Sequence, residues 1–100
     1  MGYRITREAQ RDLNGIVSYT IAHWGKQKSQ EYLTRLQHVL SQLAEMPEMG
    51  QNRFSELGER IYSFPCVSHM IYYLHSNADI VVLAVLHQSQ TPAHHLTTRR

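Results

Sequence analysis

The stretch that decides the fold is SHMIYYLHSNADIVVLAVLH, which runs from Ser68 to His87. It contains two apolar segments rich in β-branched and aromatic residues, separated by the polar segment 75–79. This pattern predicts a β-hairpin. The second segment, Ile80 to Leu86, has no polar residue, which is typical of a strand covered on both faces or lying in the middle of a sheet. Because a lone hairpin is only marginally stable in water, the rest of the chain must supply more strands and a covering layer.

The first half of the chain predicts that covering layer. Residues 3–6 form a short strand, and Thr6 also caps a helix that Gly25 ends. Apolar residues recur along this helix at helical spacing: Ala9, Leu13, Ile16, Val17, Ile21 and Trp24. A second amphipathic helix begins directly after Gly25 and ends before Pro47. With so short a joint, the two helices fold back as an antiparallel hairpin against one face of the sheet.

The remaining segments complete a single domain over residues 1–100. Residues 46–53 are expected to form a loop, and residues 59–64 a strand that Pro65 stops. Residues 88–100 are polar and show neither helical nor strand periodicity, so we expect a flexible tail. The predicted order is β-α-α-β-β-β. The fold class is α+β, with the helical hairpin packed on a mainly antiparallel sheet.

Composition excludes several classes of protein. A single cysteine, Cys66, rules out an internal disulfide. Ten basic against eight acidic residues is too small a surplus for general electrostatic attraction to nucleic acid to be the main function. No apolar run approaches the ~20 residues of a membrane span, and the N-terminus lacks an apolar signal region, which predicts a cytoplasmic protein without membrane contact. No cofactor is expected.

Short segments spread along almost the whole chain resemble, in order, those of the ParE toxins of the RelE/ParE superfamily. They are Tyr3–Ala9 with Arg11–Leu13, Tyr19–Thr20 with His23–Gly25, Tyr32–Leu33 with Leu36 and Leu43–Gly50, Arg60–Pro65, Ser68–Tyr73 and Val85–His87. The resemblance implies a toxin that binds DNA gyrase without enzymatic activity of its own and traps it on cleaved DNA. It also implies a ParD-like antitoxin whose extended C-terminal segment wraps the toxin.

The chain departs from the family pattern near its end. Leu74 and Ala84 stand where many members have arginine, and Gln90-Thr91 stands where they often have Met-Asp. These departures leave open a different target, or an inactive homologue that only binds an antitoxin.

Candidate contact residues fall into two groups. Those expected to touch the antitoxin are Trp24, Leu36, Leu40, Arg60 and Tyr72. For Trp24 the more common role is packing at the helix–helix corner, and a binding hot spot is the alternative. Residues expected to touch the target lie at the end of the last strand and in the tail: His87, Gln88, Ser89, Gln90, Arg99 and Arg100.

An alternative function is the ribosome-dependent mRNA cleavage of the RelE branch. Arg60, His69 and His87 would then be catalytic, and Arg53 and Glu56 could assist at phosphate. However, residues 59–87 hold one arginine and no lysine, whereas the ribonuclease branch has a dense basic cluster on its sheet. His87, His94 and His95 have no familiar ligand spacing, so no metal site is predicted.

Overall fold

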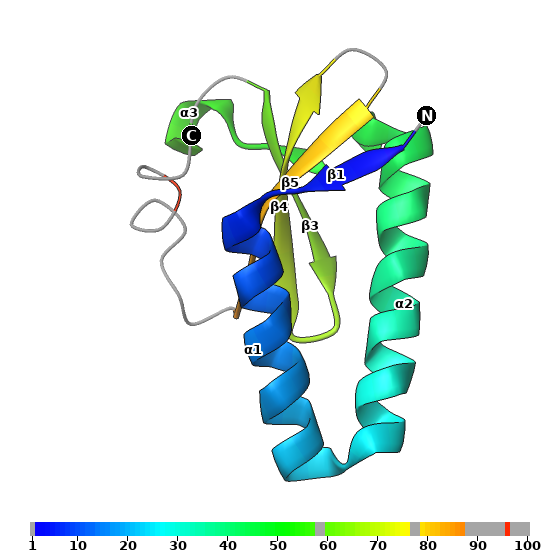
Figure 1. Cartoon of the computed structure of the whole chain (residues 1–100). Helices are drawn as coiled ribbons and strands as arrows, with labels where there is room; N and C mark the ends of the chain where they lie inside the picture. Colours follow the sequence, from blue (N-terminus) through cyan, green and yellow to red (C-terminus); the bar gives the residue numbers. More distant parts are fainter. Residues whose placement is uncertain (1, 58–59, 77–78, 88–95, 97–100) are drawn as a thin grey trace.

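The computed structural model describes residues 2–57, 60–76, 79–87 and 96. Its elements are β1 (Tyr3–Ile5), α1 (Arg7–Trp24), α2 (Lys26–Glu45), the 3-10 turn η1 (Pro47–Met49), β2 (Gln51–Asn52), α3 (Phe54–Leu57), β3 (Ile61–Cys66), β4 (His69–Ser76) and β5 (Asp79–His87). Figure 1 shows α1 and α2 as an antiparallel pair beside the sheet. The predicted α+β class and the helical hairpin are therefore confirmed.

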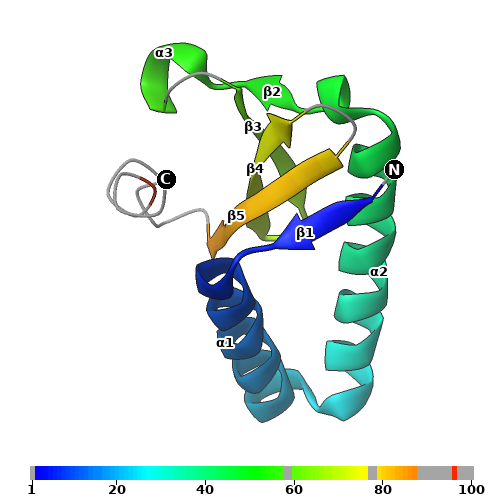
Figure 2. The same cartoon turned by 45° about the horizontal axis from the view of Figure 1, so that its top comes forward.

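Over the described ranges, the strands form one five-stranded sheet in the order β1-β5-β4-β3-β2. Strand β1 is parallel to β5, with Tyr3 opposite Ile80 and Ile5 opposite Val82, and the other pairs are antiparallel. The mainly antiparallel sheet is thus as predicted. Strand β5 lies between β1 and β4, so the apolar segment that decides the fold is an inner strand (Figure 2).

Both helix boundaries at the start of the chain follow from local chemistry. The Thr6 hydroxyl accepts a hydrogen bond from the Ala9 N–H at 3.1 Å, which satisfies one of the free donors of the first turn of α1. Gly25 has φ 89°, a conformation that glycine adopts at little steric cost, and it joins α1 directly to α2. The predicted cap and the predicted joint are both confirmed.

The sheet is covered on both faces, as the unbroken apolar run of β5 predicts. A first core lies between the sheet and the helices: Ala9, Leu13, Leu36, Leu40, Leu43, Ala44, Cys66, Ile71, Tyr73, Ile80, Val82 and Val85. A second core lies on the opposite face: Leu57, Ile61, Tyr72, Leu83, Ala84, Leu86 and Leu96. A bulge in the β4–β5 pairing, between Tyr72 and Tyr73, leaves Leu83 as the extra residue of β5.

Two predicted segments in the middle of the chain, the loop at 46–53 and the strand at 59–64, differ from the structure. The expected loop at 46–53 contains η1 and the two-residue strand β2, and α3 follows it. Strand β3 begins only at Ile61, because Arg60 has φ 66°, and it continues through Pro65, which pairs with Met70. Strand β2 pairs only with Tyr62 and Ser63, so Pro65 lies beyond its reach, where a missing N–H breaks no bond to that neighbour.

Tyr73 anchors the segment that follows α2. Its hydroxyl donates to the Pro47 carbonyl at 2.6 Å and accepts from the Gly50 N–H at 3.1 Å. Burial raises the pKa of this phenol to about 12, and the bond from Gly50 opposes that rise. A Cβ at Gly50 would overlap the Tyr73 hydroxyl, so only glycine fits against this anchor.

Three residues assigned to antitoxin contact by the sequence are core residues instead. Leu36 and Leu40 are each 2% exposed between α2 and the sheet, and Tyr72 is 4% exposed in the second core. Their side chains are covered by other residues of the same chain, so none of the three presents a surface to a partner in this structure. Leu74 packs against the second core and Ala84 belongs to it, so both departures from the family pattern are apolar contacts here.

One residue of the expected flexible tail belongs to the second core. Leu96 is 1% exposed and packs with Leu57, Tyr72 and Leu86. The rest of that tail, residues 88–95 and 97–100, lies outside the described residues. Leu96 therefore contributes to packing, although it lies in the segment expected to form a flexible tail.

Candidate functional site

The helical hairpin extends well beyond the end of the sheet (Figure 1). The first-core stripe of α1 is buried at Ala9 and Leu13, but three residues nearer the hairpin tip are exposed. Tyr19 is 61% exposed, Ile21 40% and Trp24 68%. Because 68% of it is exposed, the Trp24 side chain is not buried at the helix–helix corner.

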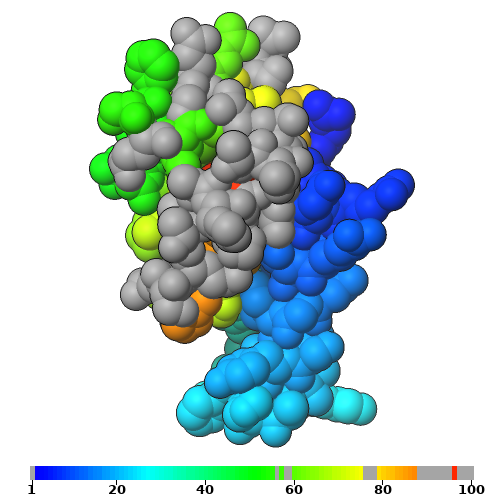
Figure 3. Space-filling view, turned by 90° about the vertical axis from the view of Figure 1, so that its left-hand side faces the viewer, coloured from blue at the N-terminus to red at the C-terminus, as the bar shows by residue number. Residues whose placement is uncertain are grey.

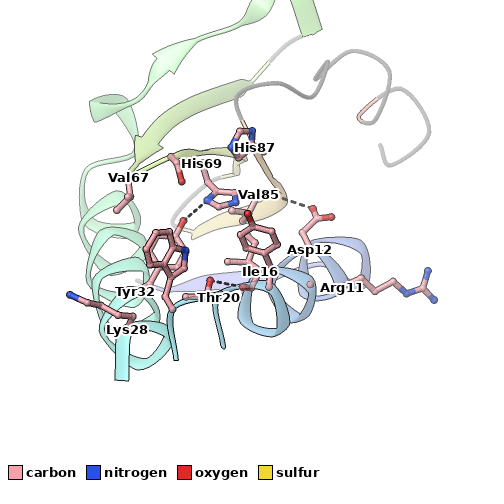
Figure 4. Close-up of a pocket in the computed structure, with 14 residues that line it drawn as sticks. Arg11, Asp12, Ile16, Thr20, Lys28, Tyr32, Val67, His69, Val85 and His87 are labelled. Atoms are coloured by element: carbon pink, nitrogen blue, oxygen red, sulfur yellow. Dashed lines mark hydrogen bonds between the residues drawn. The ribbon is translucent and has the colours of Figure 1, made fainter. Parts of the chain in front are cut away.

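A cleft of about 780 Å³ opens where the hairpin leaves the sheet. Its walls are α1, the start of α2, the turn between β3 and β4, and the end of β5 (Figure 4). Figure 3 shows the hairpin tip projecting beyond the rest of the molecule. The apolar surface of the cleft comes from residues of all four of its walls: Ile16, Tyr19, Trp24, Tyr32, Val67 and Val85.

Tyr32 of α2 lines the cleft and connects α2 to the β3–β4 turn. Its hydroxyl lies 3.3 Å from the Cys66 carbonyl oxygen and 2.9 Å from His69 Nδ1. These two residues flank the β3–β4 turn, so one side chain ties both ends of that turn to the helix. Burial raises the pKa of Tyr32 above its ordinary range, which keeps the phenol protonated and able to donate.

Two neighbouring histidines, His69 and His87, also line the cleft. His69 and His87 are directly opposite in the β4–β5 pairing, and their rings meet edge to face with centroids 5.6 Å apart. Burial lowers the pKa of His69, and the neighbouring His87 lowers it further. His69 is therefore mainly neutral at pH 7.

Asp12 links α1 to the edge of β5. Its carboxylate accepts a hydrogen bond from the Val85 N–H at 3.1 Å. Strand β1 ends at Ile5, opposite Val82, so it does not reach this donor. The carboxylate takes the place of a strand neighbour at that point, which keeps a buried backbone donor satisfied.

The lining of the cleft carries few charged side chains. Arg11 and Lys28 contribute cationic groups and Asp12 the anionic one. Lys28 is 3.8 Å from Glu31 in an exposed pair, which holds the lysine only weakly. The cleft is thus a mainly apolar surface with a slight excess of basic over acidic groups.

Of the three residues proposed for catalysis, His69 and His87 are in contact, but Arg60 is not near them. Arg60 precedes β3, whereas His69 pairs with Cys66 at the opposite end of that strand, close to His87. The Arg53 side chain donates to Ser63 Oγ at 2.9 Å, and the Glu56 side chain lies outside the described structure. Within the part of the chain that is described, no group of three or more His, Cys, Asp or Glu side chains could hold a metal ion.

The residues that the sequence assigned to contact or catalysis therefore lie on different surfaces of the molecule. Trp24 and His87 both line the cleft, while Arg60 is exposed at the far end of β3 and belongs to a different surface. Gln88, Ser89, Gln90, Arg99, Arg100, His94 and His95 lie outside the described residues. Sequence reasoning missed Tyr19, Tyr32 and Val67; an apolar stripe that continues to the last residue of α1 is the one signal that could have indicated an exposed tip.

Comparison with known proteins places this architecture in a family. The family model described as "ParE toxin of type II toxin-antitoxin system, parDE" matches residues 3–92. The chain belongs to the ParE toxin family. Toxin ParE1 of Caulobacter vibrioides is 32% identical over 94 residues, covering 94% of this chain and 96% of the relative. Toxin ParE of Escherichia coli is 29% identical over 90 residues, covering 86% and 84%.

A solved structure of the chromosomal ParDE TA system from P. aeruginosa has the same fold. Its TM-score to this ParE-type chain is 0.73 at 18% identity, covering 87% of this chain and 95% of the other. No helix in the described ranges of this ParE-family toxin is both long enough and apolar enough to cross a membrane.

Proposed function

We propose that this ParE-family toxin acts by binding other proteins, that a ParD-type antitoxin neutralises it by occupying the cleft, and that its target is DNA gyrase. The observation that carries the antitoxin proposal is the exposed apolar stripe of the α1 tip above the cleft. A folded domain rarely leaves two large aromatic side chains exposed beside a hollow unless another molecule covers them.

The cleft fits an amphipathic helix or an extended segment. Tyr19 and Trp24 project from α1 while Val67 projects from the facing turn, so an occupant would be contacted from both sides. Binding in such a groove depends on a few apolar anchors. Burying the exposed part of either aromatic ring removes on the order of 100–150 Å² from water, which is worth about 2–4 kcal/mol before the costs of association.

A partner of ParD type is supported by the family and by a structural neighbour. The matching family is that of ParE toxins from parDE systems, and the P. aeruginosa structure is likewise of a ParDE system. The lining of the cleft adds a preference, since Arg11 and Lys28 favour an antitoxin segment that carries acidic residues beside its apolar ones.

Gyrase as the target rests on the family resemblance. We assign target contact to His87, which is exposed at the end of β5, and to the tail residues that follow it. Action by binding is favoured over RNA cleavage because Arg60 lies at the opposite end of β3 from the two histidines. Arg60 is therefore not placed to stabilise a transition-state phosphate beside the two histidines, as the ribonuclease alternative requires.

The experiment is a supercoiling and cleavage-complex assay with purified bacterial gyrase, with and without the antitoxin encoded beside the toxin gene. We expect the toxin alone to inhibit supercoiling and to accumulate cleaved DNA, and an equimolar antitoxin to restore activity. A folded toxin that leaves gyrase unaffected would refute the target. A toxin that inhibits gyrase but elutes separately from that antitoxin would refute the partner, and mRNA cuts in a translating extract would favour the ribonuclease alternative.

A further inference from the structure

The turn that faces the hairpin tip has an uncommon backbone for its sequence. Val67 and Ser68 form a two-residue turn between the paired residues Cys66 and His69, and Val67 has φ 58°. Turns of this length need a positive φ at one or both central residues, so glycine, asparagine and aspartate are favoured there. A β-branched residue in this region is a conformational outlier.

The fold gains little packing in return for this strain. The Val67 side chain is 60% exposed and belongs to neither core. The turn is held from outside, because the Tyr32 hydroxyl contacts Cys66 on one side of it and His69 on the other. Strain that the surroundings maintain at an exposed residue is common at sites of binding.

Val67 lies where two concave surfaces of the molecule meet. The residue lines the cleft, and it also lines a second, more open groove along α2 that includes Gln27, Arg35 and His38. Val67 is therefore an exposed apolar side chain that borders both the cleft and this second groove. Figure 4 places it at the same end of the cleft as Tyr32 and His69.

We propose that Val67 is a specificity-determining contact for the antitoxin. The turn holds the valine out so that it inserts between apolar side chains of the antitoxin segment that occupies the cleft. This assignment rests on the proposed function, in which that segment is amphipathic and carries acidic residues toward Arg11 and Lys28. Glycine or asparagine would suit the backbone of this turn better but would remove the exposed apolar side chain.

The test measures stability and affinity together. Val67→Gly and Val67→Asn both relieve the positive-φ strain, so each variant should melt at the same temperature as the native toxin or a few degrees higher. Titration calorimetry with the purified antitoxin encoded beside the gene should show at least tenfold weaker binding for both. Val67→Ile keeps an apolar β-branched side chain and should bind within about threefold of the native toxin.

A matched control comes from the other strained residue. Arg60 has φ 66°, is exposed and lies at the opposite end of β3, outside the cleft. Arg60→Gly should gain stability as Val67→Gly does, which checks the effect of relieving the strain. Phe54→Ala removes an apolar side chain that is 60% exposed, like that of Val67, but lines neither the cleft nor the second groove, and should bind the antitoxin with unchanged affinity. Equal affinity of Val67→Gly and the native toxin would overturn the proposal, and so would equal losses of affinity for Val67→Gly and Phe54→Ala. Failure of the native toxin itself to bind would instead refute the proposed function.

Discussion

The base and the tip of the helical hairpin both carry large apolar side chains but differ in what covers them. At the base, Ala9, Leu13 and Leu40 are buried against the sheet, whereas at the tip Tyr19 and Trp24 are more than 60% exposed. The difference arises because the helices continue past the last strand residues that could cover them (Figure 1). A helix longer than its sheet therefore supplies stability at one end and a binding surface at the other.

The largest effect is expected at the base. Leu40→Ala should lower the free energy of unfolding by about 2–5 kcal/mol, because it removes buried methyl groups and leaves a cavity in the first core. Ile21→Ala, a truncation of a 40% exposed side chain near the tip, should cost about 0.5 kcal/mol or less. Urea unfolding followed by circular dichroism measures both; equal losses would remove the distinction between base and tip.

A hydroxyl deletion gives a smaller contrast of the same kind. Tyr73→Phe leaves the Pro47 carbonyl and the Gly50 N–H without their buried partner, which should cost about 1–3 kcal/mol. Tyr19→Phe removes the hydroxyl of a tyrosine that is 61% exposed and should leave the melting temperature unchanged. If Tyr73→Phe melts like the native protein, the anchor after α2 is not as the structure describes it.

The boundary between base and tip should be sensitive to pH. Because burial and His87 lower the pKa of His69, the unfolded chain binds a proton at a higher pH than the folded one. The contribution of neutral His69 to the free energy of unfolding should therefore be present above about pH 6.5 and be lost as the pH falls from there through the folded pKa. His69→Gln should reduce this slope in unfolding curves at several pH values. Identical slopes would show that His69 is not held neutral by the fold.

Much of the fold could be predicted because its signals are local. The Thr6 cap, the Gly25 joint and the two apolar segments of the C-terminal hairpin each occupy a few consecutive residues. Strand β2 was missed because two residues carry no periodicity, and the extent of β3 was missed because tolerance of Pro65 depends on where β2 ends.

The candidate site was harder to predict because it depends on relative lengths in space. Periodicity identified the apolar stripe that ends at Trp24 and the amphipathic second helix that contains Leu40, but it could not show which part of either helix the sheet would cover. Buried leucines were therefore assigned to the partner, and an exposed tryptophan was assigned first to packing. The positive φ of Val67 has no signal in the Cys-Val-Ser-His sequence, which lacks the glycine or asparagine typical of such turns.

Trp24→Ala tests the central claim most directly, because the account gives this residue a role in binding and almost none in stability. Its affinity for the antitoxin and its melting temperature should be measured beside those of the native toxin. We predict at least tenfold weaker binding, with the free energy of unfolding changed by no more than about 0.5 kcal/mol. Native affinity, or a loss of stability comparable to that of Leu40→Ala, would contradict the account.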